Sequence, residues 1–227
     1  MATKTVAGPS TYRVAGSENR DGATRVAVAV LGSLVGLAGV EHGVGEFLQG
    51  PAAPDGLFIK SWPDAAAMDI LSSEPAMTLI PNLLVTGVLA VAVGLTVTAW
   101  SIWFAHRRYG GLALIGLSAL LLLVGGGIAP PIMGLVVGAV ATRIGTTPQQ
   151  RVGRTGRALA GAWQWFLAGA VVGYLGLVPG MPLASLIGVA SDGLVIGLAT
   201  FAFANLALAL TAARAHDRMQ ATDSVIA

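Results

Sequence analysis

The sequence contains no cysteine and few charged residues. Of its 227 residues, 11% are charged and 55% are hydrophobic, and the mean hydropathy is +0.76. The absence of cysteine excludes disulfides and thiolate metal sites. A soluble domain would carry charge on about a quarter of its residues. The chain therefore lacks the charges that a water-exposed surface needs, and we predict an all-α integral membrane protein.

Nucleic acid is not an expected partner, although the isoelectric point is 9.4. No basic run is interleaved with aromatic side chains, and most arginines fall between apolar segments. Such arginines mark the cytoplasmic side of a membrane protein. Membrane lipid is the expected partner. The 31 glycines suit close helix contacts, either within one chain or in a homo-oligomer.

Six apolar segments are candidates for membrane-spanning helices, each of which needs about 20 residues. We place them at 25–48, 76–105, two within 111–144, 158–177 and 183–213. Together they form a single bundle domain over residues 25–218. Around it we expect a disordered cytoplasmic tail at 1–24, an external acidic loop at 49–75 and a cytoplasmic tail at 219–227.

The segment 111–144 is interrupted by GGGIAPP at 125–131. One kinked helix there would give five spans, whereas two helices joined by a turn would give six. With six spans, all 13 lysines and arginines except Lys60 lie on one side of the membrane, which the positive-inside rule favours. Each half is shorter than the hydrocarbon core, so a re-entrant hairpin stays open as an alternative. We predict three hairpins in a prokaryotic inner (plasma) membrane, with both termini cytoplasmic.

The candidate site lies in the first span, in the sequence EHGVGE. Its residues Glu41, His42 and Glu46 are ionisable groups in an apolar helix, and such groups usually have a function. Asp192 in the predicted sixth span lies about 13 Å from the outer end, close to the depth of Glu41 at about 10 Å. His42 and Glu46 are four residues apart and share a helix face. This pair predicts ligands for a divalent metal ion, the one cofactor we consider.

Further residues are expected to line the same polar pocket. Asn82 lies near the outer start of the predicted second span. The turn of the third hairpin is expected to approach the pocket through four residues: Gly127, Ala129, Pro130 and Pro131.

Three functional hypotheses follow from these residues. The one we favour is a carrier or channel that moves protons or a small cation through the polar pocket. In the second, the chain is an accessory or scaffold protein whose buried acids pack against a partner. In the third, it is a membrane-embedded enzyme that modifies a lipid or a quinone, with His42 and a carboxylate in acid-base roles.

Overall fold

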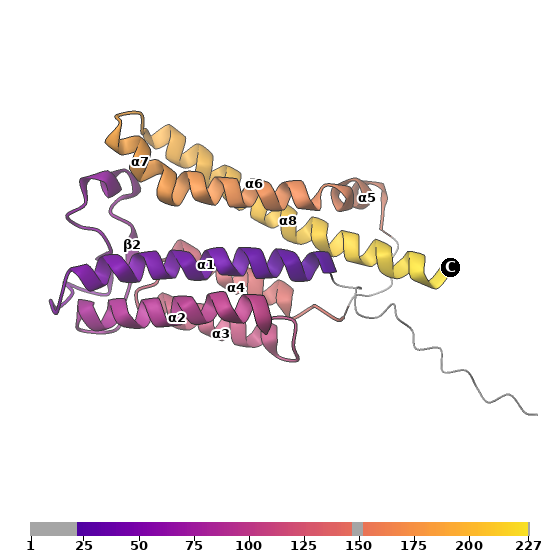
Figure 1. Cartoon of the computed structure of the whole chain (residues 1–227), viewed down its shortest axis with the longest axis horizontal. Coiled ribbons are helices and arrows are strands. Elements are labelled where there is room, and N and C mark those ends of the chain that lie inside the picture. The colour runs from indigo at the N-terminus through magenta and orange to yellow at the C-terminus, as the bar shows by residue number, and fades with distance from the viewer. Residues whose placement is uncertain (1–21, 147–151, 227) are drawn as a thin grey trace, which may run out of the picture.

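The computed structural model describes residues 22–146 and 152–226 and is mostly helical (Figure 1). In it η1 is a 3₁₀ helix, η2 is a π-helical turn, and β1 pairs with β2 in an antiparallel sheet. The elements in chain order are α1 (Gly22–Leu48), β1 (Phe58–Lys60), η1 (Ala66–Leu71), β2 (Pro75–Met77), α2 (Leu83–Trp103), α3 (Gly110–Leu123), α4 (Ala129–Ala141), α5 (Arg154–Gly161), α6 (Trp163–Leu175), η2 (Gly176–Gly180), α7 (Met181–Leu186) and α8 (Asp192–Ile226).

Four helical stretches of the described chain are long and apolar enough to cross a membrane. They are α1, α2, the stretch from α6 to the end of α7, and most of α8. α3 and α4 are also apolar but have only 14 and 13 residues, about 20 Å each. The class of helical membrane protein is therefore supported. Six full spans and cytoplasmic termini stay predictions.

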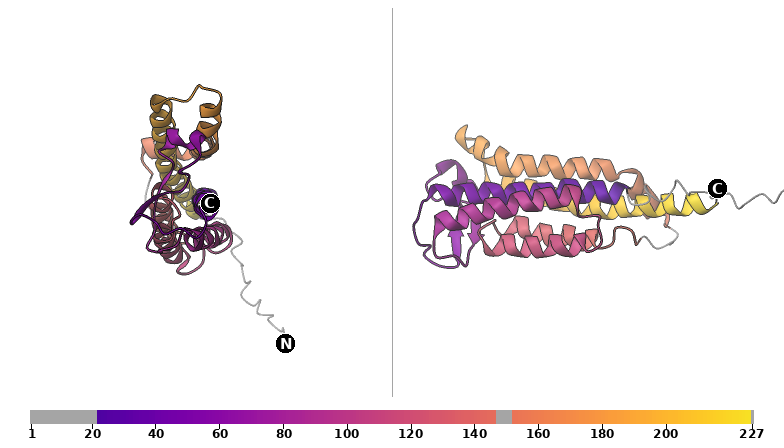
Figure 2. Two further views of the ribbon diagram at one scale, coloured as in Figure 1. Left: turned by 90° about the vertical axis from the view of Figure 1, so that its left-hand side faces the viewer. Right: turned by 60° about the horizontal axis from the view of Figure 1, so that its bottom comes forward.

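The two ends of the bundle differ in composition. We call the end that carries Arg107, Arg108 and Arg143 the basic end, and the end that carries residues 49–82 the loop end. α1 runs between these ends through the middle of the molecule and packs against α2, α4, α6 and α8. In Figures 1 and 2, the α6–α8 layer lies on one side of α1 and the α2–α4 layer on the other.

The ends of the chain differ in part from the predicted tails. Most of the predicted tail at 1–24 lies outside the described residues, but residues 22–24 already belong to α1. At the other end, residues 219–226 continue α8, and only residue 227 of that predicted tail lies outside the described residues.

α1 and α2 approach each other through glycines. A side-chain carbon at Gly43 would lie 2.8 Å from the carbonyl oxygen of Gly87 and 2.8 Å from the amide nitrogen of Val91. About two helical turns away, Gly36 faces Gly94 in the same way, whereas Gly39 faces α3. Small residues allow this backbone contact between membrane helices. These glycines of α1 therefore pack within the chain, against two neighbouring helices.

We expect Gly43→Ala to destabilise the fold by about 1–3 kcal/mol, because the added methyl group meets backbone that cannot move aside. The measurement is the thermal unfolding temperature in detergent. Gly116→Ala is the control, since a carbon added there has no neighbour within 4 Å. Equal unfolding temperatures for the two variants would contradict the α1–α2 contact.

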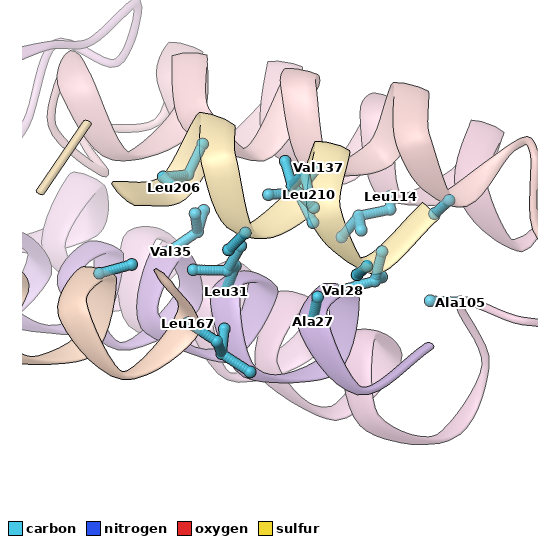
Figure 3. Packing of buried hydrophobic residues seen from close by; sticks show 14 of the residues in the cluster. Ala27, Val28, Leu31, Val35, Ala105, Leu114, Val137, Leu167, Leu206 and Leu210 are labelled. Carbon is cyan, nitrogen blue, oxygen red and sulfur yellow. The ribbon is translucent and has the colours of Figure 1, made fainter. Parts of the chain in front are cut away.

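The apolar core lies around the half of α1 nearer the basic end (Figure 3). Val28, Leu31 and Val35 of α1 meet Leu206 and Leu210 of α8 in this core. Between membrane helices such contacts are stabilised mainly by close van der Waals packing, because lipid is as apolar as these side chains. The core fixes where α8 stands relative to α1, and with it one wall of the cavity described below.

The α3–α4 hairpin ends in a turn at residues 124–128, so 111–144 contains two helices and not one kinked helix. The turn is attached to the loop end by backbone hydrogen bonds. The amide of Gly125 donates to Met77 at 2.9 Å, and the amide of Leu79 donates to Leu123 at 3.0 Å. Non-helical backbone that is shielded from water needs such partners.

The predicted boundary between the last two spans is wrong. We expected a turn at 178–182 and a helix from Leu183, but the chain stays helical to Leu186 and α8 begins at Asp192. Pro179 lies in the π turn, and Pro182 lies in the first turn of α7. Both positions tolerate a missing amide hydrogen, so these prolines do not end the helix. The second span also begins later than predicted, at Leu83.

Asp217 of α8 binds the first turn of α1. Its carboxylate is buried and accepts the amides of Ala23 at 3.0 Å and Thr24 at 2.9 Å. These amides belong to the first turn of α1, which has no helical acceptors for them. A carboxylate at that position also interacts favourably with the helix dipole. Asp217 therefore explains why α1 begins at Gly22 and not at Arg25 as predicted.

Asp217→Asn should lower the free energy of unfolding by about 1–3 kcal/mol, because a neutral amide offers one acceptor to two buried donors. Thermal unfolding of the detergent-solubilised chain measures the effect. Asp55→Asn changes an exposed carboxylate and should leave the unfolding temperature unaltered. An Asp217→Asn chain as stable as the parent would show that the cap contributes little.

Candidate functional site: a buried histidine between two glutamates

α1 brings its polar residues to the loop end of the bundle. His42 is 7% exposed and Glu46 is fully buried, whereas Glu41 is half-buried. α1 alone cannot bury these side chains, because they lie within about two turns of its end at Leu48. The segment between α1 and α2 folds back over them.

That segment carries Glu74, which the sequence analysis did not select. Backbone hydrogen bonds from Ser61 to Glu74 and from Trp62 to Ser73, each 3.1 Å, continue the pairing of β1 with β2. Ser72, Ser73 and Glu74 all have positive φ angles, between 52° and 57°. This conformation is uncommon for residues other than glycine. It turns the Glu74 side chain inward, where it is only 6% exposed.

The imidazole of His42 lies between two carboxylates. Its Nδ1 is 3.1 Å from Oε2 of Glu41 and 3.6 Å from Oε2 of Glu74. Nδ1 also lies 3.0 Å from the carbonyl oxygen of Ala38. The other oxygen of Glu41 accepts the indole N–H of Trp62. We call Glu41, His42 and Glu74 the EHE cluster; one ligand atom from each lies within 4.8 Å of the other two.

Two carboxylate oxygens of the EHE cluster have no hydrogen-bond donor. They are Oε2 of Glu41 and Oε2 of Glu74, the two oxygens that face Nδ1 of His42. Burial, reinforced by the neighbouring carboxyl of Glu41, raises the pKa of Glu74 to about 9. At neutral pH the carboxyl of Glu74 is therefore protonated unless a cation lies beside it.

Glu46 stands apart from the EHE cluster. Its Oε1 accepts the hydroxyl of Ser61 at 3.3 Å, and its Oε2 lies against Gly125 without a donor. In the described chain the three side chains whose possible ligand atoms lie together are Glu41, His42 and Glu74, and Glu46, which the sequence paired with His42, is not in this group.

The structure places two other predicted pocket residues elsewhere. Asp192 is exposed at the first turn of α8, which begins later than we expected, and it does not line the cavity described below. Asn82 is the N-cap of α2, where its side chain accepts the amide of Val85 at 3.1 Å.

The hairpin turn does approach the site, as the sequence predicted. A carbon added at Gly127 would lie 2.6 Å from Nε2 of His42, so the imidazole packs directly on this glycine. Ala129 and Pro130 begin α4 on the wall of the adjoining cavity, and Pro131 is buried behind them.

A cavity of about 210 Å³ adjoins the EHE cluster. His42, Glu74 and Tyr174 are its polar lining residues, and all other lining residues are apolar. The apolar residues come from α1, η1, β2, α4, α6, η2 and α8: Leu31, Leu34, Ala38, Leu71, Pro75, Ala129, Pro130, Met133, Ala170, Leu177, Val178, Ala202, Phe203 and Leu206. The cavity is therefore amphipathic, with its polar part at the EHE cluster.

Trp62→Phe should weaken the attachment of the loop to α1, because Glu41 loses its indole donor while the aromatic packing is largely kept. Loss of a donor to a buried carboxylate costs about 1–3 kcal/mol. Hydrogen exchange of residues 61–74 should become faster in this variant. Trp103→Phe, at an exposed position near the basic end, is the control. Unchanged exchange in Trp62→Phe would contradict the role of this hydrogen bond.

Comparison with known proteins does not assign the chain to a family. A scan against protein-family models and searches of curated proteins and solved structures found no match to the chain. The chemistry of the EHE cluster and its cavity therefore carries the functional argument.

Proposed function

We propose that this protein binds an amphiphilic molecule of the bilayer, a lipid or a quinone, and acts on its polar head at the EHE cluster. The observation that supports the proposal is the cavity, which has apolar walls and ends on His42 and Glu74. Ligand sites commonly combine such apolar walls with a few convergent polar groups.

The size of the cavity suits part of such a molecule. An apolar cavity of about 150 Å³ already admits a benzene ring, and this one measures about 210 Å³. A quinone ring or a short length of acyl chain would fit, with the rest of the molecule extending between helices into the bilayer. The groups at the polar part, an imidazole and two carboxyls, are those used in acid-base and metal-assisted catalysis.

The transport of protons or a small cation, which we favoured from the sequence, has less support from the geometry. On the basic side of the cavity the protein is packed with apolar side chains, among them Val28 and Leu210. Among the described residues, the only fully buried charged side chain on that side is Asp217, which holds the first turn of α1. An ion moving from the EHE cluster to the basic end would have to cross this core.

The accessory or scaffold hypothesis is a second candidate with less support. It predicts that the buried acids pack against a partner, whereas within the described chain Glu74 and Glu46 are already covered by the chain's own loop and hairpin.

Filling the cavity should abolish binding of the amphiphile. Met133→Trp adds volume at the cavity wall on α4, and Val136→Trp adds the same ring on the same helix at a position 47% exposed outside the cavity lining. We expect photo-crosslinking of a diazirine-bearing phospholipid or quinone probe to fall at least tenfold in Met133→Trp and to persist in Val136→Trp. Equal labelling of both variants would refute the cavity as the binding site.

A further inference from the structure

We propose that Glu41, His42 and Glu74 bind one divalent transition-metal ion, of the Zn²⁺ or Mn²⁺ type, at the polar part of the cavity. This inference deepens the proposed function, since it assigns a cofactor to the same site. Binding of the ion itself does not require the amphiphile.

The distances in the EHE cluster are those of a ligand set. Zinc lies about 2.1 Å from nitrogen and oxygen ligands, so neighbouring ligands of a tetrahedral ion are about 3.4 Å apart. Nδ1 of His42 is 3.1 Å and 3.6 Å from the two carboxylate oxygens. One carboxylate oxygen from each glutamate and one ring nitrogen of His42 lie within 4.8 Å of one another. Small side-chain movements are enough to place all three atoms around one ion.

The hydrogen bonding leaves the ligand atoms available. The buried oxygens without donors include the two that face Nδ1, whereas the other oxygen of Glu41 is held by Trp62. Buried polar atoms normally have partners, and a group of orphaned oxygens calls for an ion or water between them. The indole bond leaves Oε2 of Glu41 directed at the same point as Oε2 of Glu74.

Charge also favours a cation. Two ionised carboxylates and a neutral imidazole carry a charge of −2, and among the described residues neither Glu41 nor Glu74 forms an ion pair with a lysine or arginine. A divalent ion would neutralise the cluster without a buried excess of charge. Metal ions bind the deprotonated forms of such ligands.

The ligand types narrow the class of ion. Imidazole nitrogen suits zinc and transition metals, whereas calcium and magnesium prefer oxygen ligands alone. Three protein ligands leave at least one coordination position, which is typical of catalytic metal sites. Because His42 and Glu74 both line the cavity, that position would meet the polar head of a bound amphiphile.

Metal binding is measured on the full chain, purified in mild detergent with a tag that contains no histidine. After treatment with a chelator, the protein is titrated with Zn²⁺ or Mn²⁺ by equilibrium dialysis, and bound metal is counted by elemental analysis. We expect one ion per chain, with affinity reduced at least tenfold in Glu74→Gln and in His42→Asn.

Two controls separate this set from other acids. Glu46→Gln removes the glutamate that the sequence paired with His42, and Asp64→Asn removes an exposed loop carboxylate; both should bind metal as the parent does. Thermal unfolding of each variant shows that it is folded.

Several outcomes would overturn the metal site. In the first, the parent chain binds neither ion at micromolar concentration. In the second, Glu74→Gln and His42→Asn leave metal binding unaffected. In the third, Glu46→Gln loses as much metal affinity as those two variants. If the parent binds no metal but Met133→Trp still lowers probe labelling, the metal site is refuted and the proposed function stands. If metal binds as expected but Met133→Trp is labelled as strongly as the parent, the proposed function is refuted and the metal site stands.

Discussion

The structure depends on the burial of acidic groups beside the apolar part of one helix. Glu46 is fully buried and Glu74 nearly so, and a buried carboxylate without compensation is strongly destabilising. The segment between α1 and α2 provides part of that compensation, because its Trp62 and Ser61 donate to Glu41 and Glu46. This segment is therefore part of the core of the protein as well as a connection.

The same constraint explains the form of the α3–α4 hairpin. Its turn lies against His42 and Glu46, where any side chain at Gly125 or Gly127 would collide with them. Both glycines have positive φ angles, 96° and 82°, which suit a tight turn. Backbone hydrogen bonds with Met77 and Leu79 supply partners for the turn and for the end of α3 before it. The GGG sequence thus serves two needs, a turn in the chain and space for the polar residues of α1.

The sequence was informative where the signal was local. The apolar class follows from the composition of the chain, and the polar groups of EHGVGE and the turn at GGGIAPP follow from a few neighbouring residues. The start of the last helix was misplaced because two prolines in permissive helical positions were taken as the end of a span. Glu74 was missed because it belongs to an acidic loop. Only long-range pairing with Ser61 and three left-handed residues bury it.

The cavity follows from how the two helical layers meet α1. Near the basic end α8 packs closely on α1 through Ala209, Leu210 and Ala213. At the loop end η1 contacts α7 and α8. Leu71 at the end of η1 and Glu74 just after it both line the cavity. One segment therefore completes the EHE cluster and closes the cavity above it, so that a molecule held between the layers meets His42 and Glu74 together.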